Sequence, residues 1–124
     1  MQVFDWNKTA DDAVTTGYQR KVVFLGGLTV ARITGEAGET TQAHSHDADE
    51  LVVVLQGAWR FTVGDREVTL RDGQGLLIPA GVEHSAEMLE PTVAFDVCSG
   101  DRRDWLSGED RHLHVNLDEF LWAV

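Results

Sequence analysis

The chain has 124 residues, a formal net charge of −11 and a hydrophobic fraction of 43%. This length and apolar content suit one domain, 1–124, with a single core. A chain this acidic does not attract nucleic acid or anionic lipid through its overall field. It also contains no run of about 18 apolar residues that would span a membrane. We therefore expect neither a nucleic-acid partner nor a membrane partner.

The sequence also bears on the cellular compartment. The first eight residues lack the basic and apolar regions of a signal peptide, so we expect none. Cys98 is the only cysteine, which rules out a disulfide within the chain and fits a reducing compartment. These features favour a cytoplasmic protein.

The N-terminal third predicts an arm followed by a hairpin. Phe4 and Trp6 alternate around Asp5, a pattern typical of an edge strand or of a docked arm, and we favour the arm. Residues 21–25 and 28–34 are rich in β-branched side chains and flank Gly26-Gly27, so they predict two strands joined by a tight turn.

Residues 51–55 are apolar at every position, whereas a strand with one solvated face alternates. One side of this strand should line the core. The other side should contact a second sheet, the N-terminal arm or another subunit, and this favours a homodimer. Shorter strands follow at 59–63, 67–70, 76–78, 83–89 and 92–98, with Gly or Pro at most joints. This spacing predicts an all-β barrel or jelly roll with its core at about 20–99.

The C-terminal extension, about 101–124, predicts a short helix. Asn116 can cap it, and the residues from Leu117 to Val124 place an apolar stripe on one helical face. His112 and His114 alternate but lack a carboxylate at matching spacing. We interpret these two histidines as surface or interface residues.

Two segments in the middle of the chain carry residue types that bind metals. In an extended segment, His44 and His46 point to one face, about 6.6 Å apart at Cα, and can converge on one ion. Glu50 can return a carboxylate to the same ion. His84 follows a Pro-Ala-Gly turn, which would place it at the start of a strand. Three imidazoles and a carboxylate predict one divalent transition metal, and these ligand types do not choose among Fe, Mn, Ni, Cu and Zn.

The two segments resemble the signature motifs of the cupin superfamily. The first motif is matched by Gly38, His44, His46, Glu50 and Gly57. The second is matched by Gly73, Pro79, Gly81 and His84, with Met88 where cupins often have Asn. The resemblance implies a cupin-type double-stranded β-helix, that is, a jelly-roll barrel.

A narrower resemblance covers about residues 18–106. The segment 95–106 is similar to the tail of the small single-domain cupins that linearise uronates in pectin and alginate breakdown. This resemblance implies a metal-bound 4,5-unsaturated uronate that is opened to its linear keto form. By position, Asp96 would be the proton-handling carboxylate and Arg102 the residue that holds the substrate carboxylate.

Further residues near these positions have more than one interpretation. Arg20 is a second candidate clamp, because a guanidinium pairs bidentately with a carboxylate. Asp96 could instead bond backbone at the mouth of the barrel. Cys98 replaces an aromatic residue of the family and is interpreted as a small core side chain. Glu50 stands where that family often has Gln, which makes the metal site more negative.

Three functions remain open at this stage. The first is a metal-dependent lyase or isomerase that acts on a small carboxylated substrate, most simply a sugar acid. The second is an Fe- or Cu-dependent dioxygenase of a small aromatic, since the same ligands suit oxygen chemistry. The third is a non-enzymatic cupin that binds a small molecule.

Overall fold

The computed structural model describes residues 1–100, and most of these residues lie in antiparallel strands. A single 3-10 turn, η1 (Trp6–Lys8), precedes them. The strands are β1 (Asp12–Thr15), β2 (Tyr18–Phe24), β3 (Leu28–Gly35), β4 (Thr40–His44), β5 (Glu50–Gln56), β6 (Ala58–Val63), β7 (Arg66–Arg71), β8 (Gly75–Ile78), β9 (His84–Met88) and β10 (Thr92–Ser99).

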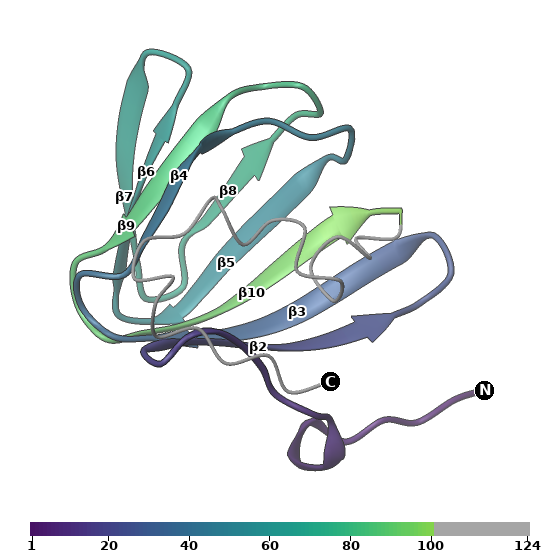
Figure 1. Cartoon of the computed structure of the whole chain (residues 1–124). Coiled ribbons are helices and arrows are strands. Elements are labelled where there is room, and N and C mark those ends of the chain that lie inside the picture. Colours follow the sequence, from purple (N-terminus) through teal and green to yellow (C-terminus); the bar gives the residue numbers. More distant parts are fainter. Residues whose placement is uncertain (101–124) are drawn as a thin grey trace.

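The strands form two sheets that face each other (Figure 1). The larger sheet has six strands in the order β1-β2-β3-β10-β5-β8, and the smaller has four in the order β4-β9-β6-β7. Neighbours that are distant in sequence, such as β3 and β10, pair antiparallel along their whole length. This arrangement confirms the predicted all-β jelly roll.

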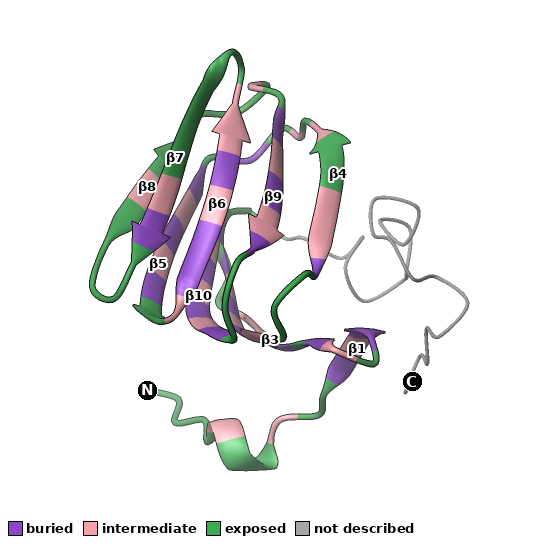
Figure 2. Cartoon of the chain, turned by 90° about the vertical axis from the view of Figure 1, so that its left-hand side faces the viewer, coloured by how far each residue is buried: buried purple, intermediate pink, exposed green. Residues whose placement is uncertain are grey.

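The core lies between the two sheets, because alternate residues of the central strands point inward. Val52 and Val54 of β5 and Ala94 of β10 are fully buried from the larger sheet. Trp59 and Phe61 of β6 face them from the smaller sheet, with their rings 4.8 Å apart. The resulting stripes of buried residues are visible along β5, β6 and β10 (Figure 2). Burial of this apolar surface is the main favourable contribution to folding.

The predicted hairpin at Gly26-Gly27 is present. The backbone N–H of Leu25 donates to the carbonyl of Leu28 at 2.8 Å, and Gly26 has a φ of 67°. A positive φ of this kind favours glycine, which explains the residue chosen at this turn.

One strand was not expected from the sequence, and another was expected with different bounds. β1 is short, and its pairing with β2 is irregular between Ala13 and Thr15. β4 ends at His44, so the extended segment expected to carry both His44 and His46 leaves His46 in a loop, and the pairing of β4 with β9 is irregular between Thr41 and His44. Neither segment shows the apolar alternation that marks a strand in a sequence.

The N-terminal segment docks as an arm. The Trp6 ring lies 6.0 Å from the ring of Phe95, and Phe4 lies 5.0 Å from Trp6. The Lys21 ammonium donates to the Trp6 carbonyl at 2.8 Å. The predicted extension 101–124 and its helix lie outside the described residues. No helix within residues 1–100 has the length and apolar character needed to cross a bilayer.

Candidate metal centre

The structure brings the three histidines of the two motifs together between the sheets. His44 is the last residue of β4, His84 is the first residue of β9, and the two are paired in register. His46 follows two residues after His44, in the loop that leads to β5. The three rings lie 4.4 to 5.6 Å apart between centroids, and one ring nitrogen of each lies within 4.8 Å of the others.

The orientation of each imidazole is set by a backbone carbonyl. The Nδ1 atom of His44 lies 2.9 Å from the Gln42 oxygen, and that of His84 lies 2.9 Å from the Val82 oxygen. His46 Nδ1 lies 3.0 Å from the Ala48 oxygen. A carbonyl can only accept, so each Nδ1 donates its hydrogen there and Nε2 is the ring nitrogen left for other partners. A ring with no hydrogen on Nε2 is the form that would bind a metal through that atom.

Glu50 adds a carboxylate beside the three imidazoles. It opens β5, and its Oε1 lies 3.0 Å from His46 Nε2 and 3.3 Å from His84 Nε2. The side chain is 7% exposed, so it occupies the interior rather than the rim. Three neutral imidazoles and one carboxylate in this arrangement fit a divalent transition metal. When bound there, such an ion would polarise a hydroxyl or carbonyl oxygen of a ligand.

The electrostatics of the centre suit a cation. Burial lowers the pKa of His44, and the two neighbouring histidines lower it further, so the ring favours the neutral form that binds a metal. Burial alone would raise the pKa of Glu50. Hydrogen bonds with His46, His84 and Asp96 outweigh that effect and hold the pKa of Glu50 below its usual range.

A network of hydrogen bonds fixes the loop between the first two histidines and Glu50. The Asp49 carboxylate accepts from the Ala80 N–H at 2.9 Å, and the Asp49 N–H donates to the Ser99 hydroxyl at 2.9 Å. The N–H of Gly81 donates to the His46 carbonyl at 2.8 Å. The Pro-Ala-Gly turn of the second motif therefore positions a ligand of the first.

Asp96 lies on the inner face of the larger sheet, beside the centre. It is 6% exposed and is hydrogen-bonded to Glu50. Cys98 follows on the same face, fully buried, with its sulfur 3.7 Å from an Asp96 oxygen. The sequence interpretation of Cys98 as a core residue missed this proximity to the ligands. The shared parity of residues 96 and 98 was the available signal.

Arg20 is placed on the inner face of the same sheet, two strands from Asp96. It is 2% exposed, and its Nε and Nη2 atoms donate to one Asp12 oxygen at 3.1 and 2.8 Å. A substrate held by Arg20 would have to share the guanidinium with Asp12. The sequence interpretation did not identify Asp12 as the partner, because β1 itself was not predicted.

The remaining candidate residues of the sequence analysis fall outside the described part of the chain. These are Arg102, the predicted substrate clamp, and His112 and His114, the second alternating pair. Their predicted roles stay predictions.

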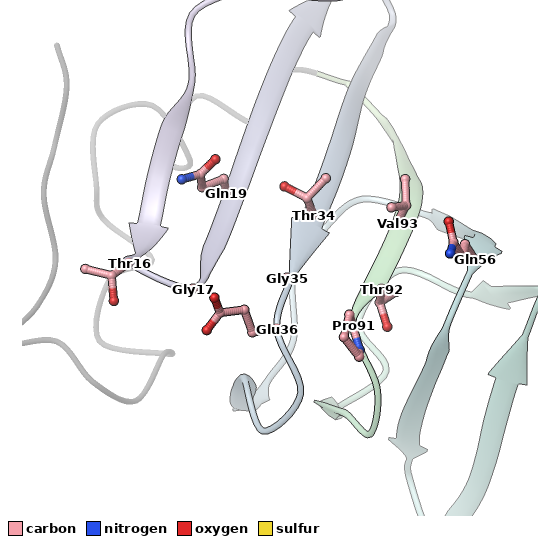
Figure 3. Close-up of a pocket in the computed structure, with 10 residues that line it drawn as sticks. All are labelled: Thr16, Gly17, Gln19, Thr34, Gly35, Glu36, Gln56, Pro91, Thr92 and Val93. Carbon is pink, nitrogen blue, oxygen red and sulfur yellow. The ribbon is translucent and has the colours of Figure 1, made fainter.

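A separate hollow is lined by Thr92 and Val93 at the start of β10, whereas Asp96 and Cys98 lie toward the end of that strand (Figure 3). Its volume is about 340 Å³, and Gln19, Thr34, Glu36 and Gln56 contribute polar groups to its wall. No histidine or basic residue lines it. The hollow therefore offers neither an imidazole ligand nor a counter-charge for a carboxylated substrate.

Two facing antiparallel sheets with three histidines and a glutamate gathered between them place the chain among β proteins whose interior can hold a metal ion. Residues 31–98 match the cupin domain family, and the chain belongs to that family. It is also 33% identical over 79 residues to a nitrosourea synthase of Streptomyces achromogenes subsp. streptozoticus, a match that covers 62% of this chain. The match covers 17% of the synthase, so the chain spans about one sixth of that protein's length.

Solved structures share the whole barrel. KdgF from Halomonas sp. superposes with a TM-score of 0.77 at 26% identity, covering 84% of this chain and 97% of KdgF. An RmlC-like cupin from Shewanella frigidimarina gives 0.78 at 21% identity, covering 85% and 96%. An oxalate decarboxylase of Bacillus subtilis gives 0.72 at 19% identity, covering 78% of this chain and 29% of the decarboxylase. The last two likenesses concern the fold alone, and together these structures confirm the prediction of a small cupin.

Proposed function

We propose that this cupin is a metal-dependent enzyme of the lyase or isomerase type that opens a 4,5-unsaturated uronate to its linear keto form. The observation that carries the proposal is the position of Asp96. This carboxyl group lies inside the barrel, on the strand next to Glu50, where it can reach a substrate bound at the metal centre.

Opening the uronate ring requires few catalytic groups from the protein. When the ring opens, the ring hydroxyl loses a proton, the adjacent carbon–oxygen bond breaks, and an alkene carbon gains a proton. No atom is lost, so one carboxyl group that accepts and then donates a proton is sufficient. In the proposal Asp96 has this role, and Arg102 pairs with the substrate carboxylate. Arg20 is a second proposed contact, on the inner face of the same sheet.

The sequence resemblance at 95–106 supports this substrate class over others. A strongly acidic chain repels an anionic sugar through its overall field, so a local arginine is needed to hold one. Arg102 lies in the segment that carries the resemblance, six residues after Asp96.

The experiment follows the loss of the alkene's ultraviolet absorbance when the metal-loaded protein is mixed with a 4,5-unsaturated uronate. We expect Asp96→Asn to lower kcat by about 100-fold or more, because the amide cannot exchange the proton. Arg102→Gln should raise KM about 10- to 100-fold, the loss of a charged hydrogen-bonded pair.

Arg103→Gln is the matched control, because it removes the same charge at the neighbouring position. Rates equal to those in buffer alone would reject the proposal. Equal effects of the Arg102 and Arg103 variants would reject the role of Arg102.

A second candidate is oxidation of a small molecule by oxygen at the same centre. The match to a nitrosourea synthase favours it, because a nitrosourea contains an oxidised nitrogen. The three-histidine, one-glutamate set also suits Fe and Cu oxygen chemistry. Oxygen uptake in the presence of candidate phenols or ureas, with no change in the uronate, separates this candidate from the first. A binding-only cupin would show tight binding with neither reaction.

A further inference from the structure

A second group of side chains with metal-binding atoms lies directly beside the histidines. Glu50, Asp96 and Cys98 each offer an oxygen or a sulfur, and these atoms lie within 4.8 Å of one another. All three side chains are buried, and Cys98 has no exposed surface. The proposed ring opening assigns no role to the Cys98 thiol.

The backbone brings these three groups together without any rearrangement. Cys98 of β10 and Glu50 of β5 are direct partners across the antiparallel pair. Asp96 lies two residues before Cys98 and so points to the same face of the sheet. Side chains on adjacent central strands are held rigidly, which suits a small cation.

Glu50 belongs to both groups. Its Oε1 lies 3.0 Å from His46 Nε2 and 3.3 Å from His84 Nε2, and one of its oxygens lies within 4.8 Å of an Asp96 oxygen and of the Cys98 sulfur. A carboxylate has two oxygens and can therefore bridge two cations. In two-metal sites of proteins the ions lie about 3.5–4 Å apart, a separation that one bridging carboxylate can span.

We propose that the barrel contains a second ion position, formed by Glu50, Asp96 and Cys98, and that Glu50 bridges it to the histidine position. A thiolate among the ligands selects a soft divalent ion, and Zn²⁺ or Cd²⁺ is the class that fits. A cation at this position offsets the buried carboxylates that otherwise lie side by side. The proposal concerns the metal content and holds for any substrate, and an ion held by one Asp96 oxygen leaves the other oxygen for the proton transfer proposed above.

The competing interpretation is that Cys98 is a core side chain whose thiol donates to an Asp96 oxygen at 3.7 Å. In that case the barrel holds one ion, and sulfur does not touch it. The two interpretations differ in the number of ions bound and in whether the ion contacts sulfur.

The experiment reconstitutes the purified full chain with Co²⁺ and measures both quantities. Metal analysis gives the number of ions per chain, and the near-ultraviolet charge-transfer band of a cobalt–thiolate bond reports sulfur ligation. Cys98 is the only cysteine, so the band can arise from no other residue. We expect two ions and the band in the wild type, one ion and no band in Cys98→Ser, and one ion with the band in His46→Ala.

Three results would overturn the proposal. They are one ion per chain in the wild type, no thiolate band in the wild type, and loss of both ions in His46→Ala, which would mean that the two groups hold a single ion jointly. Cys98→Ala serves as a second variant, because serine oxygen can itself bind metal, and the thermal unfolding of each metal-free variant checks its fold. A failed uronate assay would leave these ion counts unchanged, so the two proposals fail separately.

Discussion

At the scale of single residues, the geometry of the centre depends on the hydrogen bonds that orient each imidazole. A backbone carbonyl two residues away orients each of His44, His46 and His84, so that Nε2 rather than Nδ1 faces the interior. Arg20 forms a buried ion pair with Asp12. The exposed fractions of the two side chains are 2% and 7%.

This buried pair leads to a prediction about stability. Asp12→Asn leaves the Arg20 charge buried beside an uncharged amide, and we expect the free energy of unfolding to fall by about 3 kcal/mol. Glu90→Gln is the control, because Glu90 pairs with Arg71 at 3.3 Å on the surface and should cost roughly 0.5 kcal/mol or less. Urea denaturation measures both. An Asp12→Asn variant as stable as the wild type would show that Arg20 is not held for structure, which would favour its role as a clamp.

At the scale of elements, the turns of the two motifs position the strands that carry the ligands. Gly57 ends β5 with a φ of 112°, and its N–H donates to the Asp72 carboxylate at 2.8 Å. A Cβ at this position would press against the backbone of Pro91 and Thr92. The first motif therefore ends in glycine for reasons of both conformation and space.

We expect Gly57→Ala to lower the free energy of unfolding by about 3 kcal/mol or more, since strain and a backbone clash add. Gly64→Ala is the matched control. Gly64 also has a positive φ, of 60°, but a Cβ there meets nothing within 4 Å, so the cost should be about 1 kcal/mol. Urea denaturation of the two variants tests the difference. Equal costs would show that the contact with Pro91 and Thr92 does not matter.

The elements differ in how far the sequence predicts them. Apolar runs and glycine joints predicted β5, β6 and β10, because the core dictates residue type there. The bounds of β1 and β4 could not be predicted from the sequence. Their side chains are polar or their pairing is irregular, so neither strand has the apolar alternation that marks one. Motif spacing predicted that His44, His46, Glu50 and His84 lie close together. It could not reveal that Cys98 faces Glu50, because the register of β10 against β5 joins positions 48 residues apart.

At the scale of the whole molecule, the outer face of the larger sheet is apolar. Leu51 and Val53 of β5 point away from the core, and Leu77 of β8 is 74% exposed. The N-terminal arm reaches Phe95 on this face, the pairing partner of Val53. We propose that a second copy of the chain covers the rest, since monomeric proteins rarely leave large apolar patches exposed.

A charge placed on this face should separate such a dimer. We expect the wild type to elute as a dimer and Leu77→Asp as a monomer in size-exclusion chromatography with light scattering, because an interface does not tolerate an unpaired buried charge. Val68→Asp is the control, because Val68 is an exposed apolar residue, 39% accessible, on the smaller sheet. A monomeric wild type, or a Leu77→Asp variant that still elutes as a dimer, would contradict this proposal.

The proposed catalysis depends on a cation bound where β4, β5 and β9 meet. The most direct test is a crystal structure of the unstripped protein with anomalous diffraction data. We predict a peak about 2.0–2.1 Å from the Nε2 atoms of His44, His46 and His84, with a Glu50 oxygen at about 2.0–2.2 Å. No peak among these atoms, or a peak only elsewhere in the molecule, would contradict the account.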